Sequence, residues 1–233
     1  MTEQLPDGVS ARIVELARTT GVSSAGITSV SDLLQSPSHL SRETTEWSER
    51  GRSVVVVSLA HEEARPELDW WGVEGGTAGN HRLQAILKDL EARLHTHYGL
   101  ESWPLPYSPA AYLKDAAVLA GMGAIGDNNL LITPEYGPRV RLRALLVDGE
   151  LTLTGPVAYT PCDSCDHPCW EACPQRAFAS GRYARERCQL QMEEDDRNRV
   201  EKESTSPGGT PISLIKYCRA CELACPVGQG CDV

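Results

Sequence analysis

Seven of the nine cysteines in this 233-residue chain lie in two short runs near its end, and each run closes on Cys-Pro. The runs comprise Cys162, Cys165, Cys169 and Cys173, and then Cys218, Cys221 and Cys225. Their spacing is close to the C-x2-C-x2-C-x3-C-P pattern of bacterial ferredoxins, in which thiolates bind the iron of [4Fe–4S] clusters. Because the last cysteine of such a run binds the other cluster, we expect two neighbouring clusters, with Cys188 supplying the missing thiolate.

Zinc and disulfides are the alternatives for these cysteines. Paired C-x2-C spacings also occur in zinc sites, but the C-x3-C-P endings favour iron and sulfur. Disulfides need an oxidising compartment, and Met1 to Pro6 has neither the basic nor the apolar region of an export signal. We therefore expect a cytoplasmic protein with reduced, ligating thiols, and we expect Cys231 to be a spare thiol.

The first run contains one extra residue, because Asp-His-Pro separates Cys165 from Cys169 where two residues are usual. A loop can absorb this insertion without moving the sulfurs far. His167 in this loop is either a hydrogen-bond donor to a cluster sulfur or an exposed loop histidine, and the second interpretation is favoured.

Length and composition leave room for a second domain before the cysteines. A chain with 41% hydrophobic residues can hold a domain of about 150 residues and a small cluster domain, which we place at residues 1–158 and 159–233. No stretch approaches the roughly 18 apolar residues of a membrane span. The net charge of −10 has the wrong sign for general nucleic-acid binding. The alternating Arg139, Arg141 and Arg143 are interpreted as the solvated face of a strand.

The spacing of apolar residues predicts the elements that position the cysteines. Helices are expected at residues 9–20, 80–98 and 110–120, with Asn80 as the N-cap of the second. Strands are expected at residues 24–28, 53–59, 129–133 and 140–147, and the last two should form a hairpin. Helices and strands in mixed order indicate an α/β or α+β layer fold.

A glycine-rich segment from Gly121 through Gly123 to Gly126 has the G-x-G-x-x-G form of dinucleotide sites. It follows a helix and precedes a strand, however, which is the reverse of the order in a dinucleotide-binding unit. The glycines form either a tight connection with positive φ angles or a backbone platform for a large flat cofactor. Trp70 and Trp71 either cover a flat ring or pack against the core.

The segment from Gly121 to Gly137 reads GMGAIGDNNLLITPEYG and is followed by the two cysteine runs with a single cysteine between them. This combination resembles the epoxyqueuosine reductases, whose relatives are the reductive dehalogenases. The resemblance covers roughly residues 115–226. It implies a nitroreductase-like α/β domain that binds cobalamin, followed by a small ferredoxin-like domain that carries two [4Fe–4S] clusters.

The resemblance also implies site residues. One cluster would be bound by Cys162, Cys165, Cys169 and Cys225, and the other by Cys173, Cys188, Cys218 and Cys221. The corrinoid pocket would be lined by Gly121, Gly123, Gly126, Asn128, Tyr136 and Gly137. Asp127 stands where the family has a lysine.

The proton-donating aspartate of the family has no counterpart, since Leu105-Pro106-Tyr107 occupies that stretch. Tyr107 is the candidate catalytic acid because a neutral phenol can donate a proton in a reductive step, although a structural tyrosine in a turn fits as well. The chain also stops soon after the last run, without the family's C-terminal helical repeats linked to tRNA recognition. With the net charge of −10, this argues against tRNA as a partner.

These observations predict a cobalamin-dependent iron–sulfur oxidoreductase, in which two clusters pass electrons to a bound corrinoid that reduces a small substrate. The alternative, favoured by the missing acid, is a corrinoid carrier or reductive activator that reduces cobalamin or delivers it to a partner protein. Expected partners are a small-molecule substrate or a corrinoid protein, and an electron donor such as ferredoxin or flavodoxin. The acidic residues 193–196 are interpreted as solvated surface or as a docking site for that donor.

Overall fold

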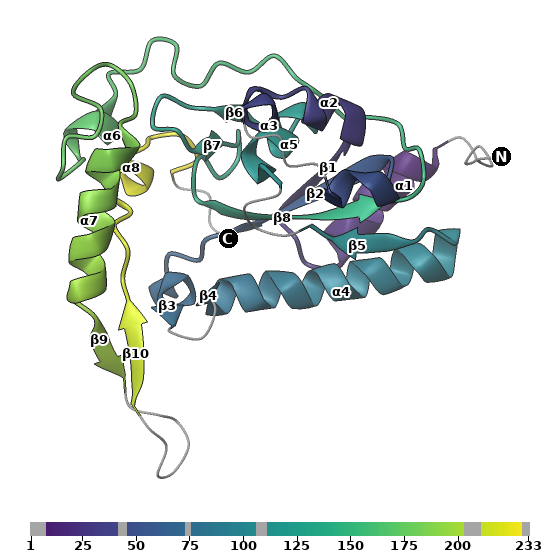
Figure 1. Ribbon diagram of the computed structural model, residues 1–233, viewed down its shortest axis with the longest axis horizontal. Coiled ribbons are helices and arrows are strands. Elements are labelled where there is room, and N and C mark those ends of the chain that lie inside the picture. Colours follow the sequence, from purple (N-terminus) through teal and green to yellow (C-terminus); the bar gives the residue numbers. More distant parts are fainter. Residues whose placement is uncertain (1–7, 42–45, 73–75, 106–110, 203–210, 230–233) are drawn as a thin grey trace.

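The computed structural model describes residues 8–41, 46–72, 76–105, 111–202 and 211–229. A four-stranded antiparallel sheet forms its centre, with helices on both faces (Figure 1). In spatial order its strands are β1 (Ser24–Ser29), β2 (Ser53–Ala60), β8 (Val140–Val147) and β5 (Ser102–Pro104). The predicted mixture of helices and sheet in layers is confirmed.

Strand β2 lies in the middle of the core, and all eight of its residues are buried. Successive side chains of a strand point to opposite faces. Val55 and Val57 therefore belong to one hydrophobic cluster, whereas Val54 and Val56 belong to another. A strand that is apolar on both faces needs a helical layer on each side.

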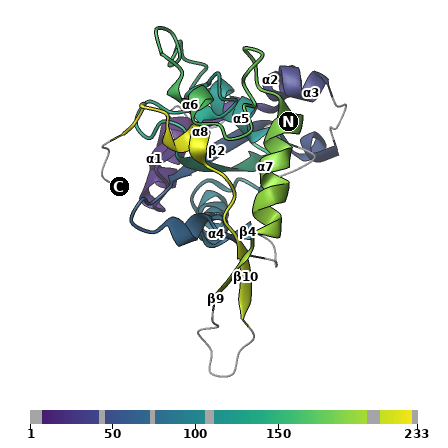
Figure 2. The same cartoon turned by 90° about the vertical axis from the view of Figure 1, so that its left-hand side faces the viewer.

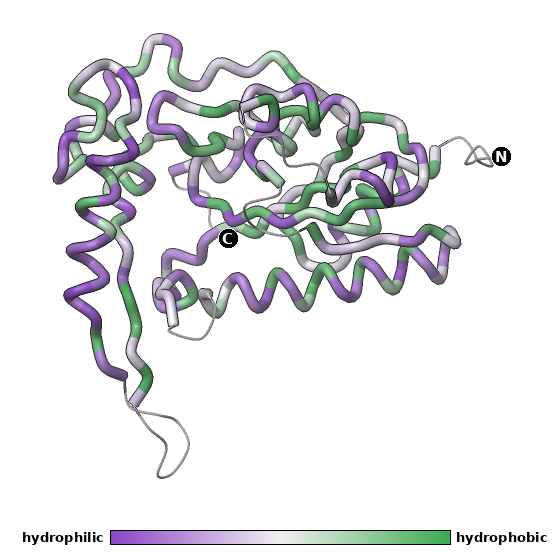
Figure 3. Tube along the Cα trace, viewed as in Figure 1, coloured by the Kyte–Doolittle hydropathy of each residue, from purple (hydrophilic) through white to green (hydrophobic). Residues whose placement is uncertain are grey.

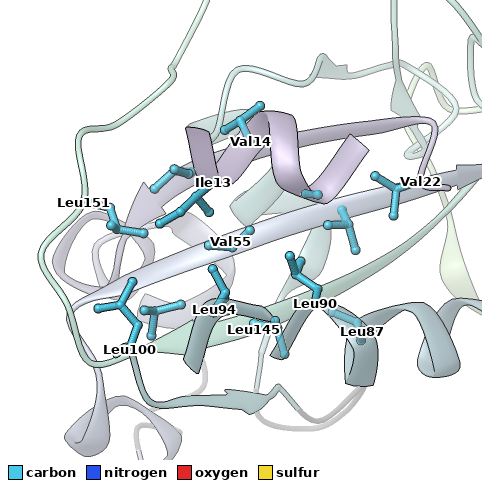
Figure 4. Packing of buried hydrophobic residues seen from close by; sticks show 14 of the residues in the cluster. Ile13, Val14, Val22, Val55, Leu87, Leu90, Leu94, Leu100, Leu145 and Leu151 are labelled. Atoms are coloured by element: carbon cyan, nitrogen blue, oxygen red, sulfur yellow. The ribbon is translucent and has the colours of Figure 1, made fainter. Parts of the chain in front are cut away.

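Helices from separate parts of the chain supply these two layers. One face is covered by α1 (Val9–Thr19) and α4 (Ala78–Tyr98), whose apolar side chains pack against the sheet in Figure 4. The other face is covered by α2 (Val30–Leu34) and α5 (Leu113–Leu119). Short helical segments complete the described chain: α3 (Pro37–Leu40), α6 (Pro168–Glu171), α8 (Ala220–Leu223) and the 3-10 turns Glu46–Arg50 and Pro66–Asp69.

The N-cap of helix α4 lies three residues before the position predicted from the sequence. Its N-cap is Thr77, whose hydroxyl oxygen accepts a hydrogen bond of 3.0 Å from the backbone N–H of Asn80. The prediction that Asn80 caps this helix is therefore wrong, because Asn80 already lies in its first turn. The helix ends at Gly99, which has a φ of 65° that favours glycine.

The predicted hairpin of residues 129–133 and 140–147 is wrong. Strand β7 (Leu131–Ile132) pairs with β6 (Ala124–Ile125), whereas β8 lies between β2 and β5. Thr133 and Gly137 exchange two backbone hydrogen bonds of 2.9 Å. This turn redirects the chain, and the apolar residues of β8 then enter the central sheet.

The interpretation of the alternating arginines as a solvated face is also wrong. Arg139, Arg141 and Arg143 are only 4%, 8% and 7% exposed. Buried charges need partners. Arg139 donates a hydrogen bond of 3.2 Å to the carbonyl oxygen of Cys225, and Arg141 forms an ion pair with Asp69. This side of β8 therefore faces the cysteine-bearing segment.

A second antiparallel sheet joins distant parts of the chain. Its strands, in order, are β4 (Gly76–Thr77), β3 (Trp71–Gly72), β10 (Ile212–Ile215) and β9 (Val200–Lys202). Together with α7 (Arg185–Arg197), β9 and β10 form an arm that extends away from the central sheet (Figures 1 and 2). No residue of α7 is buried, and Figure 3 shows this helix as largely hydrophilic. The acidic residues 193–196 lie on it.

The division of the chain at residue 158 stays a prediction. Strands β3 and β10 come from opposite sides of that position and pair with each other. None of the helices in the described ranges is long and apolar enough to cross a membrane.

The core between α4 and the sheet should dominate the stability of this region. Leu90 has no exposed surface, so Leu90→Ala removes buried apolar area and leaves a cavity. We expect a loss of about 2–5 kcal/mol. The exposed Lys88 on the same helix is the control, and Lys88→Ala should stay within about 0.5 kcal/mol. Chemical unfolding of both variants measures this, and equal effects would contradict the packing described here.

Candidate functional site

Four cysteines from two distant stretches line one small cavity. They are Cys162, Cys165, Cys169 and Cys225. Helix α6 carries Cys169 and packs against α8, which Cys225 follows by two residues. Burial raises the pKa of the Cys169 thiol to about 11, and the neighbouring thiols of Cys225 and Cys162 add to that effect. We call these residues the first quartet.

The other four described cysteines form a second group. Burial raises the pKa of the Cys221 thiol to about 12, and further contributions come from Cys218, Cys188 and Cys173. Cys188 lies on α7, and Cys173 follows α6. We call Cys173, Cys188, Cys218 and Cys221 the second quartet. Each quartet thus contains cysteines from both runs, although the binding of a cluster by each stays a prediction.

Backbone amides contact a thiol in each quartet. The N–H of Asp127 donates to the Sγ of Cys162 at 3.4 Å, and the N–H of Ala177 donates to the Sγ of Cys173 at 3.3 Å. Donors of this kind tune metal-bound sulfur. No three His, Cys, Asp or Glu side chains in the described ranges converge as ligands of a single ion.

His167 contacts an acid rather than a cysteine sulfur. Its Nε2 lies 2.7 Å from the Oδ2 of Asp127, and its ring lies 4.5 Å from that of Trp170. Asp127 therefore joins this histidine to Cys162, which its backbone N–H contacts. The role of Asp127 at this point could not be read from the sequence, because 40 residues separate it from His167.

A cavity of about 730 Å³ lies between the central sheet and the second quartet. Aromatic rings line part of it: Trp71, Tyr112, Tyr183 and Tyr217. Trp71 and Tyr217 meet edge to face, with ring centroids 5.9 Å apart. Arg219 and Glu222 also line the cavity, and they immediately follow Cys218 and Cys221. The same short segment therefore contributes to the cavity and to the second quartet.

A buried charge network lies on one wall of this cavity. Glu222 accepts from the Nε of Arg219 at 3.1 Å and lies 2.8 Å from the Nδ1 of His61. Asp69 pairs with both Arg219 and Arg141. Burial lowers the pKa of His61, and its contact with Glu222 opposes this only in part. Burial alone would raise the pKa of Glu222, but hydrogen bonds with His61 and Arg219 outweigh it and lower that pKa.

Residue spacing in the sequence does not reveal this network. A local signal existed, because His61 directly follows the buried strand β2 and Arg219 and Glu222 flank Cys221. The contacts of His61 with Arg219 and Glu222 span about 160 residues and could not be inferred from spacing.

The glycine segment does not line the large cavity. Gly121 has a φ of 74° and packs against the backbone of Thr154 and Gly155. A Cβ at Gly123 would overlap the carbonyl oxygen of Ile132, and one at Gly137 would overlap that of Val227. The tight-connection interpretation of these glycines therefore has a direct structural basis. Their role in corrinoid binding stays a prediction.

The other predicted site residues in the described ranges do not line the large cavity. Asn128 lies beside the first quartet, whereas the next residue, Asn129, lines the large cavity. The backbone N–H of Tyr136 donates to Thr133 Oγ1 at 3.2 Å, and Tyr136 is not among the lining residues. Tyr107 and Cys231 lie outside the described residues.

Comparison with known proteins identifies a curated relative. No protein-family model matches the chain. Epoxyqueuosine reductase of Lactococcus garvieae (strain Lg2) is 30% identical over 194 residues, which are 78% of this chain and 53% of the relative. This chain is a homologue of epoxyqueuosine reductase. It spans about half the length of that curated relative.

Solved structures of the same kind share the fold. An epoxyqueuosine reductase in complex with an epoxyqueuosine-modified tRNA-Tyr stem loop has a TM-score of 0.68 at 20% identity, over 97% of this chain and 66% of that chain. A reductive dehalogenase whose structure suggests a mechanism for B12-dependent dehalogenation has a TM-score of 0.53 at 14% identity. That match covers 76% of this chain and 28% of the dehalogenase.

The prediction that tRNA is an unlikely partner is wrong. It used the net charge of −10 and the end of the chain, yet a tRNA-bound epoxyqueuosine reductase matches 97% of this chain. Net charge does not decide such contacts, because binding depends on the local distribution of charge.

Gly123→Ala tests whether this glycine serves packing or cofactor binding. The added methyl group would meet the β7 backbone, so we expect a loss of stability of about 1–3 kcal/mol. Gly72→Ala is the control, because a Cβ there meets only ordinary contacts at 3.8 Å and beyond. Thermal unfolding of the iron-loaded variants distinguishes the two roles. Unchanged stability combined with lost cobalamin binding would favour the platform role.

Cys225→Ser tests the composition of the first quartet. The variant should lose the cluster that Cys162, Cys165 and Cys169 would share with Cys225 and should retain about four of about eight irons. Cys218→Ser should remove the other cluster instead, and Cys231→Ser should remove neither. Iron analysis and electron paramagnetic resonance of anaerobically reconstituted proteins measure these outcomes. Loss of the same signal in both variants would refute two separate quartets.

Proposed function

We propose that this chain is an oxidoreductase in which two [4Fe–4S] clusters supply electrons to a corrinoid held in the 730 Å³ cavity. One observation carries the proposal. Residues 218–222 place two thiols in the second quartet and two side chains, Arg219 and Glu222, on the cavity wall. A single turn of chain therefore joins the proposed electron source to the proposed site of reaction.

The quartets fit iron–sulfur clusters by the chemistry of their donors. Each offers four thiols, and thiolates are the ligands that such clusters use. Burial, and then repulsion by the neighbouring thiols, raises the pKa values of Cys169 and Cys221, so these thiols resist ionisation by themselves. A bound metal offsets that repulsion, because a coordinating thiol is deprotonated outright.

The cavity offers a large flat cofactor an aromatic lining and room for part of its volume. Ligand sites usually measure about 300–1,000 Å³ and combine aromatic surfaces with a few placed polar groups. Here Trp71, Tyr112 and Tyr217 supply ring surfaces, and Arg141 and Asn80 supply polar groups. A bound corrinoid would contribute the cobalt chemistry, while the chain would supply its position.

The proposal allows more than one kind of substrate. A small molecule is the first candidate, and Tyr107 as its proton donor stays a prediction. A modified tRNA stem loop is the second candidate, because the tRNA-bound epoxyqueuosine reductase matches nearly all of this chain. A corrinoid carrier or activator would accept neither substrate and would pass reduced cobalamin to a partner protein.

Cobalamin titration of the anaerobic, iron-loaded protein tests the proposal. Trp71 lines the cavity and its neighbour Trp70 does not, so the two form a matched pair. We expect Trp71→Ala to weaken cobalamin binding about three- to tenfold and Trp70→Ala to leave it unchanged. Visible absorbance measures the affinity. Absence of binding in the parent would contradict the proposal and favour a ferredoxin-like carrier of electrons.

A further inference from the structure

Asp195, one of the four acids at residues 193–196, contacts a cysteine of the second quartet. It is half-buried, and its Oδ2 accepts a hydrogen bond of 2.7 Å from the backbone N–H of Cys218. Residues 216–219 belong to no helix or strand, so regular backbone pairing does not satisfy this N–H. A charged acceptor makes such a hydrogen bond stronger than a neutral one does. The carboxylate therefore holds the backbone of a predicted cluster ligand.

A short chain of hydrogen bonds continues from Asp195 across α7. Its Oδ1 accepts from the Nε2 of Gln191 at 2.9 Å, and the Oε1 of Gln191 accepts from the Nε2 of Gln175 at 3.1 Å. Gln175 lies two residues after Cys173, and Gln191 lies three residues after Cys188 on the same side of α7. The hydrogen bonds therefore reach each of the three segments that carry the second quartet.

The local charges of α7 make the position of Asp195 unfavourable. It lies in the last turn of this helix, where the backbone carries partial negative charge, and residues 193–196 are all acidic. Burial raises the pKa of the Cys218 thiol, and the negative charge of Asp195 adds to that effect. This charge therefore acts on the place where a bound cluster would gain an electron.

We propose that Asp195 is a positioning residue of the second quartet, whose carboxylate holds Cys218 in place for a [4Fe–4S] cluster and lowers the reduction potential of that cluster. The inference rests on the proposed function, because it requires a cluster in the second quartet. Loss of a group that orients a metal ligand typically weakens metal binding about 10–100-fold. A negative charge beside the cluster disfavours its reduced form, which carries one more electron.

Asp196 offers a matched control on the next residue of the helix. It is also an aspartate, but its carboxylate pairs with Arg199 at 2.7 Å, and 44% of its side chain is exposed. Substitution of either aspartate changes the net charge of α7 by the same amount. A difference between the matched variants therefore reports on the contact with Cys218 and not on general surface charge.

Asp195→Asn removes the charge and keeps an oxygen that can accept from the Cys218 N–H. In anaerobically reconstituted protein we expect it to retain about eight irons and to favour reduction of the second cluster about tenfold, which is about 59 mV for one electron. Asp196→Asn should leave that potential unchanged. Redox titration followed by electron paramagnetic resonance measures the potential, and the signal that Cys218→Ser removes identifies the second cluster.

Asp195→Ala removes both the charge and the acceptor. It should lower the iron content toward about four per chain, whereas Asp196→Ala should retain about eight. Iron loss in Asp195→Asn as well, with Asp196→Asn intact, also supports the positioning role. Equal iron contents and equal potentials in the Asp195 and Asp196 variants overturn the proposal. Circular dichroism verifies that the variants keep their helices.

The same measurements separate this inference from the proposed function. A parent protein with two clusters, whose Asp195 variants behave like the Asp196 variants, retains the proposed function and loses the inference. A parent protein with two clusters that binds no cobalamin, but whose second cluster responds to Asp195→Asn, retains the inference and loses the corrinoid part of the proposed function. A parent protein that forms no second cluster overturns both.

Discussion

The exchange of cysteines between two sequence runs is the constraint on which the rest of the arrangement depends. Cys225 joins three cysteines of the first run, and Cys173 joins the second quartet. Helices α6 and α8 pack against each other, and α7 carries Cys188. Clusters bound as proposed would tie these three helices together and fix Arg219, which lies between two of the cysteines, relative to the central sheet.

Buried ion pairs also attach the second cysteine run to the central sheet. Asp69 lies between Arg141 on the sheet and Arg219 in the second cysteine run. Removing one partner of a buried pair typically costs about 3–5 kcal/mol, because it leaves an uncompensated charge. The network therefore holds the segment around Cys218 and Cys221 against the cavity wall.

The sequence allowed the local elements to be predicted where periodicity was strong. The valine run forms β2 and the regularly spaced leucines form the buried side of α4, as predicted. Each pattern can bury its apolar side chains in one kind of element. The hairpin prediction was wrong because β8 finds better partners in β2 and β5 than in its neighbour β7. Arg141 was misread because only the fold brings Asp69 to it. The cavity was not predictable from spacing, since its lining residues extend from Ser38 to Glu222.

Electron transfer inside one molecule tests the central claim most directly. Protein that carries both clusters, with and without bound cobalamin, is given less than one electron per chain under anaerobic conditions. Electron paramagnetic resonance then reports where the electrons reside. The account predicts that the reduced-cluster signal is smaller in the cobalamin-bound sample and that the cobalt changes oxidation state in proportion. An unchanged cluster signal with cobalamin bound and still oxidised would contradict it.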